Sequence, residues 1–320
     1  MSVVAQPDSD GFYFAHLSDP HLTTLQGVRW RQLMNKRMLG YLSWHRKRRA
    51  EHRSEVLEAL LEDLQRSRPE HIVITGDLTH VGLPQEFRQA RLWLDRLGAY
   101  EQVTVIPGNH DAYVRTAWDT TYAQWAPYMQ SDPAYRSGDA NTELFPSLRV
   151  RHGVALIGLS SAVASPPLMA TGTLGQEQRD RLTSILRETG QQGLFRLVLL
   201  HHSPREEEEK WRKRLTDGRA LCSILGEEGA ELILHGHGHR NAESGVPYAA
   251  GEIPVFGIPS ASAIGHKSGR EAQYRLYRIR RHGDAWSMQV SVRGYQAGSR
   301  SFIQLQGHHL SVPVMPSTSS

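Results

Sequence analysis

The sequence contains almost none of the residues that cross-link small or secreted folds. Cys222 is the only cysteine among 320 residues, so no disulfide can form within the chain. A single cysteine is typical of a reducing compartment, because disulfides persist mainly in oxidising ones. No run of about 18 apolar residues occurs, which argues against a transmembrane helix. Residues 1–11 lack the charged and apolar stretches of a secretory signal, so we expect a cytoplasmic protein with a flexible N-terminus.

Basic and acidic residues nearly balance over most of the chain, and the net charge is only +4. The positive charge is concentrated in residues 29–53, which hold nine Lys or Arg side chains and a single acid, Glu51. The other 28 basic and 32 acidic residues leave a net charge of −4. A local cluster of this kind favours contact with an anionic surface or substrate, whereas a nuclease requires a longer basic groove.

Five short polar blocks each follow an apolar run, and together they span 221 residues. The apolar runs predict short strands buried on both faces, over residues 12–17, 71–75, 103–106, 197–200 and 232–234. The carboxyl ends of such strands lie along one edge of a sheet, so the blocks can converge. In chain order, the blocks are Asp19-Pro20-His21, Gly76-Asp77, Gly108-Asn109-His110-Asp111, His201-His202 and Gly236-His237-Gly238-His239.

The side chains in these blocks are those that hold divalent metal ions. Carboxylates, one carboxamide and several imidazoles form a mixed oxygen and nitrogen set without a thiolate. Such a set suits Mn, Fe, Zn or Mg rather than copper(I) or an iron–sulfur cluster. A glycine also stands next to Asp77, Asn109 and His237, where the chain must turn sharply to direct a side chain at a cation.

The order of the blocks resembles the calcineurin-like, or dinuclear metallophosphoesterase, superfamily, from about Asp19 to His239. The resemblance implies an α/β fold, a four-layer αββα sandwich of two mixed sheets, and a phosphohydrolase with two divalent metal ions. It assigns the first metal to Asp19, His21, Asp77 and His239. It assigns the second metal to Asp77, which would bridge, and to Asn109, His201 and His237. It also implies that His110 is a proton donor or charge stabiliser oriented by Asp111.

One ligand position is ambiguous in the sequence, because His201 and His202 are adjacent. Neighbouring residues at a strand end point to opposite sides, so only one of them is expected to be a ligand. Similar proteins with a His-His-x-Pro run use the first histidine, which favours His201. His202 then has a supporting role or lies at the rim of the site.

This set of residues predicts hydrolysis of a phosphodiester or pyrophosphate bond. Two cations sharing Asp77 would lower the pKa of a bridging water, and the resulting hydroxide would attack phosphorus in line. His110 would then protonate or stabilise the leaving oxygen, a contribution of about 10²- to 10⁴-fold by the precedent of general acids.

An insertion over about residues 24–53 separates the first two blocks, and the helix 54–66 that follows supplies the expected crossover. Apolar residues recur within it at spacings of three and four, which predicts a basic amphipathic helix of about four turns. The insertion is either a helix packed on the body, a cap that covers substrate or faces a membrane, or a nucleic-acid contact. A second charged segment, 206–214, also emerges near the ligands; either its Arg212, Lys213 or Arg214 approaches a phosphate, or the segment is a solvated loop with internal charge pairing.

The remaining pattern predicts one domain over residues 12–303 and an unstructured tail over 304–320. The segment 259–262 should return near the site, where it could contact the substrate. Helices are predicted over 84–97, 113–125, 175–188 and 217–228. Strands are predicted over 148–152, 154–159, 254–257, 274–280 and 285–295.

Several substrates fit this reaction class. The blocks resemble bacterial cyclic-nucleotide phosphodiesterases, which act on small soluble diesters, about as well as the UDP-diacylglucosamine pyrophosphatases of lipid A synthesis. The basic insertion slightly favours a lipid-linked substrate and contact with the inner membrane surface of a bacterial cell. A DNA exonuclease fits less well, and a non-catalytic scaffold fits least, because no ligand position is missing. The sequence sets neither the metal nor the oligomeric state.

Overall fold

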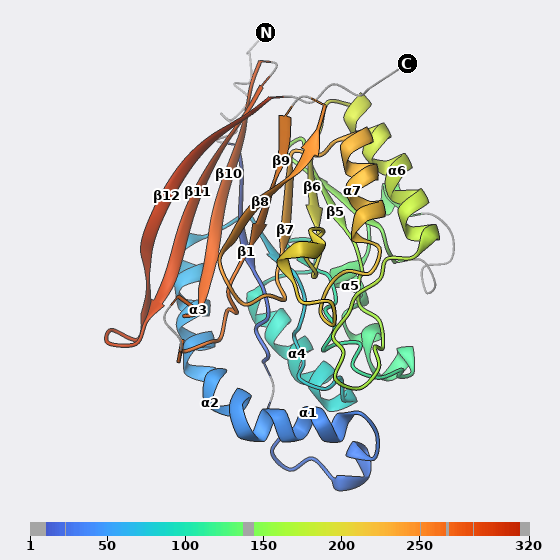
Figure 1. The fold of residues 1–320 in the computed structure, drawn as a ribbon. Coiled ribbons are helices and arrows are strands. Elements are labelled where there is room, and N and C mark those ends of the chain that lie inside the picture. Colours follow the sequence, from blue (N-terminus) through green and yellow to red (C-terminus); the bar gives the residue numbers. More distant parts are fainter. Residues whose placement is uncertain are drawn as a thin grey trace.

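Two six-stranded mixed sheets form the centre of the molecule (Figure 1). In spatial order, the first sheet contains β12 (Ser301–Pro313), β11 (Ala285–Gln296), β10 (Gln273–His282), β1 (Phe12–Leu17), β2 (His71–Ile74) and β3 (Val103–Val105). The second contains β4 (Ser147–Arg151), β5 (Val154–Gly158), β6 (Phe195–Leu199), β7 (Leu232–His235), β9 (Gly251–Gly257) and β8 (Ala242–Tyr248). The computed structural model describes residues 11–22, 24–136, 144–249, 251–266, 269–283 and 285–313.

Helices cover the outer face of each sheet, so the molecule has four layers (Figure 1). Helices α3 (Ser54–Ser67) and α4 (Pro84–Leu97) cover the first sheet, while α6 (Gln176–Gln191) and α7 (Gly218–Glu228) cover the second. A hydrophobic core lies between each sheet and its helices, and a third core lies between the inner faces of the two sheets. Phe14 of β1 and Leu197 of β6 belong to this third core. The predicted αββα sandwich is therefore confirmed.

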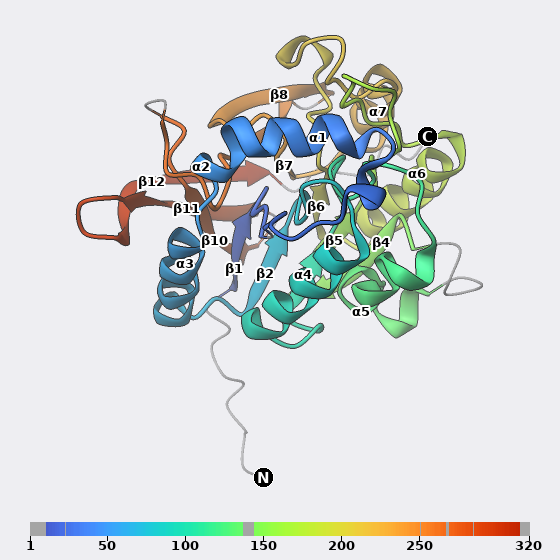
Figure 2. The ribbon, with the colours of Figure 1, turned by 90° about the horizontal axis from the view of Figure 1, so that it is seen from below.

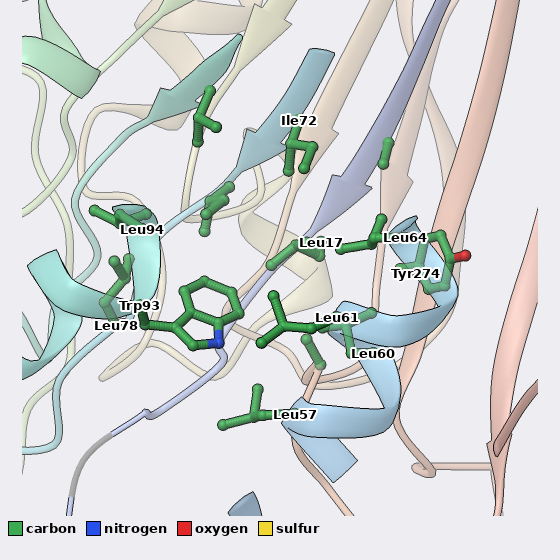
Figure 3. Close-up of a cluster of buried hydrophobic side chains, with 14 of the residues drawn as sticks. Leu17, Leu57, Leu60, Leu61, Leu64, Ile72, Leu78, Trp93, Leu94 and Tyr274 are labelled. Carbon is green, nitrogen blue, oxygen red and sulfur yellow. The ribbon is translucent and has the colours of Figure 1, made fainter. Parts of the chain in front are cut away.

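Helix α3 shows how the sequence pattern produces a layer. Its apolar residues recur on one stripe, and Figure 3 shows Leu57, Leu60, Leu61 and Leu64 directed at Leu17 and its neighbours beneath the sheet. Leu60 is fully buried. Truncation of a leucine in such a position costs about 2–5 kcal/mol. This packing fixes the crossover helix and therefore the ends of the two strands that it connects.

Parallel pairing aligns the strand ends that carry the polar blocks. In the first sheet β1 is parallel to β2, and β2 to β3; in the second, β5 to β7 are parallel in turn. All of these strands therefore end on the same side of their sheet. The short helices α1 (Arg37–Ser43) and α2 (Arg49–Glu51) run across that side, as the view from below shows (Figure 2).

The insertion does contain a helix of about four turns, but it begins later than predicted, because the uninterrupted helical run extends from Arg37 to Glu51 through α1, a π-helical turn and α2. A 3-10 turn over Trp30–Leu33 precedes α1, and a π-helical turn over Trp44–Arg48 joins α1 to α2. Asn35 interrupts the predicted helix, because its side chain accepts a hydrogen bond of 2.9 Å from the backbone N–H of Arg37. Leu33 and Trp44 are buried against the body.

The prediction of a helix over residues 113–125 was wrong. Two 3-10 turns, Trp118–Thr120 and Tyr122–Gln124, occupy its place, followed by the short α5 (Ala126–Met129). The Thr121 hydroxyl donates to Ala117 O at 2.7 Å, and the residue has φ −128° and ψ −99°. Threonine hydroxyls that bond the local backbone compete with the helical ladder, which explains the interruption.

Part of the tail that was expected to be unstructured is a strand. β12 runs to Pro313 and pairs in antiparallel register with β11, from Gln296↔Ser301 to Ala285↔Pro313. Pairing with a long neighbour stabilises this strand despite its weak apolar pattern. Strand β8 was not predicted, and residues 1–10 and 314–320 lie outside the described residues. No helix in the described part of the chain has the length and apolar character to span a membrane.

Candidate metal centre

The first ligand group contains residues from the first, the second and the last of the five polar blocks. Asp19 and His21 follow β1, Asp77 follows β2, and one ligand atom of each lies within 4.8 Å of the others. His239 joins them from the loop after β7, with Nε2 3.0 Å from Asp19 Oδ1. Burial would raise the pKa of the Asp19 carboxyl, but the neighbouring His239 holds this pKa well below its usual value.

The second ligand group shares Asp77 with the first. Asp77, His201 and His237 each offer a ligand atom within 4.8 Å of the others. His201 Nε2 lies 3.4 Å from Asp77 Oδ2 and 3.2 Å from Asn109 Oδ1. The structure therefore brings together all seven residues that the sequence predicted as ligands, with Asp77 in the position that a bridging carboxylate requires.

Unpaired ring nitrogens indicate that this cluster fits cations. His21 Nε2 and His237 Nε2 are buried without a hydrogen-bond partner among the described residues. The other ring nitrogen of His21, Nδ1, lies 3.0 Å from Thr79 O and fixes the ring. Burial lowers the pKa of both histidines well below the usual value, so the rings are neutral. A neutral imidazole nitrogen is the form that coordinates a metal, and leaving it unpaired is otherwise costly.

The two adjacent histidines differ in what their rings contact. His201 Nδ1 lies 2.6 Å from Thr75 O, which leaves Nε2 beside Asp77. Both nitrogens of His202 are engaged outside the cluster, with Nδ1 2.7 Å from Ser161 Oγ and Nε2 3.2 Å from Ala170 O. This geometry favours His201 as the ligand and gives His202 a supporting role.

Backbone strain is concentrated at the same residues. Asp19, His21, Asp77, His237 and His239 all have positive φ, between 42° and 62°. This left-handed conformation costs about 1–3 kcal/mol per non-glycine residue and tends to occur at functional sites. Close packing also explains one of the glycines, because a Cβ on Gly108 would collide with the Asp77 carboxylate.

The expected role of Asp111 requires a correction. Its carboxylate does not orient the ring of His110; it accepts hydrogen bonds from the backbone N–H groups of Asp77, Thr79 and Gly108 at 3.0, 2.9 and 2.9 Å. Burial, with a further contribution from Asp77, raises the pKa of Asp111 to about 7. Asp111 therefore joins the loops after β2 and β3 and positions ligands.

The ring of His110 is held by a carbonyl and faces an arginine from the insertion. Its Nδ1 lies 2.6 Å from His80 O and 3.0 Å from Arg48 Nη1. The His80 carbonyl can only accept, so this shorter contact places the proton on Nδ1, and Arg48 then acts on the ring through its charge and not through a hydrogen bond. Burial lowers the pKa of His110 well below the usual value, and the charge of Arg48 adds to this effect. The neutral ring then has its lone pair on Nε2.

A cavity of about 750 Å³ opens over the cluster. Asp77, Asn109 and His110 line it, together with several basic side chains and one further acid, Glu51. Those basic residues come from three separate segments and are Arg46, Arg48, Lys213 and Arg270. A cavity of this size accommodates a small molecule, and its walls favour an anionic one.

Comparison with known proteins agrees with this geometry. Residues 12–241 match the family model of the calcineurin-like phosphoesterases. The chain belongs to this family. It is 24% identical over 235 residues to a Synechococcus protein named "Probable cyclic nucleotide phosphodiesterase". The aligned region covers 72% of this chain and 80% of that protein. The structure also resembles a dimetal phosphatase from Danio rerio, with a TM-score of 0.59, 14% identity, and coverage of 95% of this chain and 99% of that one.

Two residues of this phosphoesterase lie at the centre although the sequence did not single them out, and a third, Ser260, comes from the segment 259–262. Arg48 and His52 reach it from the insertion, and Ser260 Oγ donates to the backbone oxygen of Asp19 at 2.6 Å. The segment 259–262 does return to the site, as expected. Ser260 and Ser262 are fully buried, however, so they support ligands rather than line the cavity. In the sequence, the only indication for Arg48 and His52 was that the insertion containing them starts directly after Asp19 and His21.

Proposed function

We propose that this phosphoesterase hydrolyses the phosphodiester or diphosphate bond of a small anionic molecule, with a 3′,5′-cyclic nucleotide as the leading substrate. The observation that carries the proposal is the pair of ligand groups sharing Asp77 beneath a cavity with basic walls. The printed name of the Synechococcus relative supports the choice of a cyclic nucleotide. Two bound divalent cations would supply Lewis acidity and a water of lowered pKa.

The basic walls would hold the non-bridging oxygens of the phosphate. Arg48 faces His110 at 3.0 Å, and Lys213 lines the cavity on another segment. Partial burial lowers the pKa of Lys213 from its usual value, while Glu209 opposes this effect. Charge-assisted hydrogen bonds from such side chains are stronger than neutral ones, and they would orient phosphorus over the ligands.

His110 would act on the leaving oxygen. In the protein alone its ring is neutral, because burial and Arg48 oppose a second positive charge. An incoming phosphodiester places negative charge beside the His110 ring, and this charge favours the protonated form of the ring. The ring would then take up a proton on Nε2 and release it to the leaving oxygen, while His80 O holds Nδ1.

One observation favours a second candidate, a nucleotide-linked lipid. The insertion leaves several large apolar side chains 41–66% exposed, namely Trp30, Met34, Met38, Leu39 and Leu42. Arg29 and Arg31 are exposed beside them. Exposed apolar side chains rimmed by positive charge are typical of surfaces that meet acyl chains or anionic lipids, including the inner membrane surface.

Parallel turnover assays with Mn²⁺ test the two candidates. Cyclic AMP, UDP-diacylglucosamine and single-stranded DNA are compared with bis(p-nitrophenyl) phosphate, which reports the reaction class. We expect the highest kcat/KM for cyclic AMP and none for DNA. If a metal-loaded preparation hydrolyses none of the diesters and diphosphates, the proposed function is wrong.

A surface variant distinguishes a lipid-linked substrate from a soluble cyclic nucleotide. Met34→Gln combined with Leu42→Gln removes two exposed apolar side chains that do not line the cavity. If the substrate is a cyclic nucleotide, the variant keeps its kcat/KM within about twofold. If it is lipid-linked, KM for that substrate rises, by about tenfold for each 1.4 kcal/mol of lost apolar contact.

A further inference from the structure

The basic insertion delivers a histidine to the first ligand group. One ring nitrogen of His52 lies within 4.8 Å of a ligand nitrogen of His21 and of one of His239. The ring centre of His52 is 4.5 Å from that of His21 and 5.9 Å from that of His239. None of the five sequence blocks contains His52, which lies 31 positions beyond His21.

The position of His52 is fixed by the body of the protein rather than by the insertion alone. Its backbone forms an isolated bridge with Ala263, and its Nδ1 lies 2.8 Å from Ser262 Oγ. Ser260 of the same segment donates a hydrogen bond of 2.6 Å to the backbone oxygen of Asp19. The same short segment therefore positions one predicted ligand and His52 together.

The hydrogen bonding of the ring defines which nitrogen is available. Ser262 engages Nδ1, so we assign Nε2 as the nitrogen of His52 that lies within 4.8 Å of the ligand nitrogens of His21 and His239. A hydrogen bond to one ring nitrogen, which orients the ring while the other nitrogen faces the cation, is the arrangement that metal-bound histidines commonly have.

We propose that His52 is an additional protein ligand of the first cation, through Nε2, beside Asp19, His21, Asp77 and His239. The proposal rests on the two-metal centre of the proposed function, but not on the identity of the substrate. It makes the insertion part of the metal site, so that the two cations differ in how firmly they are held. The cation with the additional imidazole is the more firmly bound of the two.

Substitution of His52 by asparagine removes Nε2 and keeps a polar atom near the position of Nδ1 for the contact with Ser262. The chelator-stripped protein is titrated with Co²⁺, and affinity and stoichiometry are measured by calorimetry and by the visible absorption of the ion. We expect His52→Asn to weaken one of two Co²⁺ sites by about 10- to 100-fold and to change its absorption, with the other site within about twofold.

Four further variants make the result specific. His45→Asn changes an exposed histidine of the same insertion and should leave both affinities unchanged. Ser262→Ala removes the partner of Nδ1 and should weaken the same site by less than His52→Asn does. If His52→Asn does not fold without metal, as judged by circular dichroism, His52→Gln is used, because its longer amide reaches the position of Nε2 and should retain more affinity than His52→Ala.

The outcomes separate this proposal from the proposed function. Unchanged Co²⁺ affinities in a folded His52→Asn protein, with only KM altered, would assign His52 to substrate and overturn the proposal. An equal loss at both sites would also overturn it. If the wild-type protein binds two ions in a manner that depends on His52 but hydrolyses no diester, the proposed function fails and the assignment of His52 stands.

Discussion

The carboxylate of Asp111 accepts a hydrogen bond of 3.0 Å from the backbone N–H of Asp77. The same carboxylate accepts from the backbone of Thr79 and Gly108, so one side chain spans the loops after β2 and β3. Asp77 belongs to both ligand groups. The position of the shared ligand is therefore set by a residue that does not itself face the cavity.

Replacement of Asp111 by asparagine should weaken metal binding rather than change the proton-transfer step. The amide NH₂ would face backbone N–H donors, so at least one buried donor loses its partner, at a cost of about 1–3 kcal/mol. We expect Mn²⁺ affinity to fall by about 10- to 100-fold, as for other residues that orient ligands. Calorimetric titration measures this loss. Unchanged affinity together with a lower kcat would return Asp111 to a role in catalysis.

Substitutions in the ligand groups and at His110 should separate metal binding from rate. Asp77→Ala removes the ligand common to both groups, so metal content and activity should be lost together. His110→Ala should keep both ions and lose about 10²- to 10⁴-fold in kcat for a diester with a poor leaving group. Metal content by mass spectrometry and kcat are measured on the same preparations. The assignment of the acid is wrong if His110→Ala hydrolyses an unactivated diester at the wild-type rate.

Arg48→Ala should reduce activity on anionic substrates without releasing metal. The guanidinium lines the cavity and lies 3.0 Å from His110, so its loss removes a cation from the phosphate position. A charge-assisted hydrogen bond contributes about 1.5–3 kcal/mol, which corresponds to a fall in kcat/KM of about 10- to 100-fold. Arg31→Ala is the matched control, because Arg31 belongs to the same insertion and is exposed. Equal effects of the two substitutions would contradict a specific role.

The sequence predicted those helices and strands whose positions are determined by the residues of the segment itself. The bounds of β1 and α4 agree with the predicted 12–17 and 84–97, because a continuous apolar run and an amphipathic stripe are properties of the segment alone. The ligand positions followed from the same logic, since parallel strands place their carboxyl ends on one side. Convergence of the blocks then required neighbouring strands within each sheet, as β1, β2 and β3 are and as β6 and β7 are, and the packing of the two sheets against each other.

The parts that the sequence did not predict depend on distant contacts. The insertion docks because Arg37 donates to Val81 O and Gly82 O, and Lys36 Nζ donates to Ser165 O at 2.8 Å. These contacts join segments more than 40 positions apart. No periodicity encodes them, so the approach of Arg48 and His52 to the centre was not visible in the sequence. β12 was missed for the same reason, because its order comes from pairing with β11.

A buried histidine far from the metal centre predicts how stability depends on pH. His71 in β2 is buried, with Nε2 2.7 Å from Thr104 Oγ1. Burial lowers its pKa from 6.5 to about 3, and Arg149 and Arg151 add to this effect. The folded protein therefore keeps the ring neutral, whereas the unfolded chain takes up a proton below pH 6.5. The contribution is complete above pH 6.5 and is lost as pH falls towards 3.

Comparison with His71→Gln isolates this contribution, since the amide keeps a polar contact for Thr104 and does not titrate. Between pH 7.5 and pH 5, the wild-type free energy of unfolding should fall by about 2 kcal/mol more than that of the variant, from 1.36 kcal/mol for each pH unit below 6.5. Urea unfolding of metal-free protein at both pH values measures the difference. His282→Gln, at an exposed position, should show no such difference. Parallel pH profiles for wild type and His71→Gln would mean that His71 takes up its proton in the folded protein as readily as in the unfolded chain.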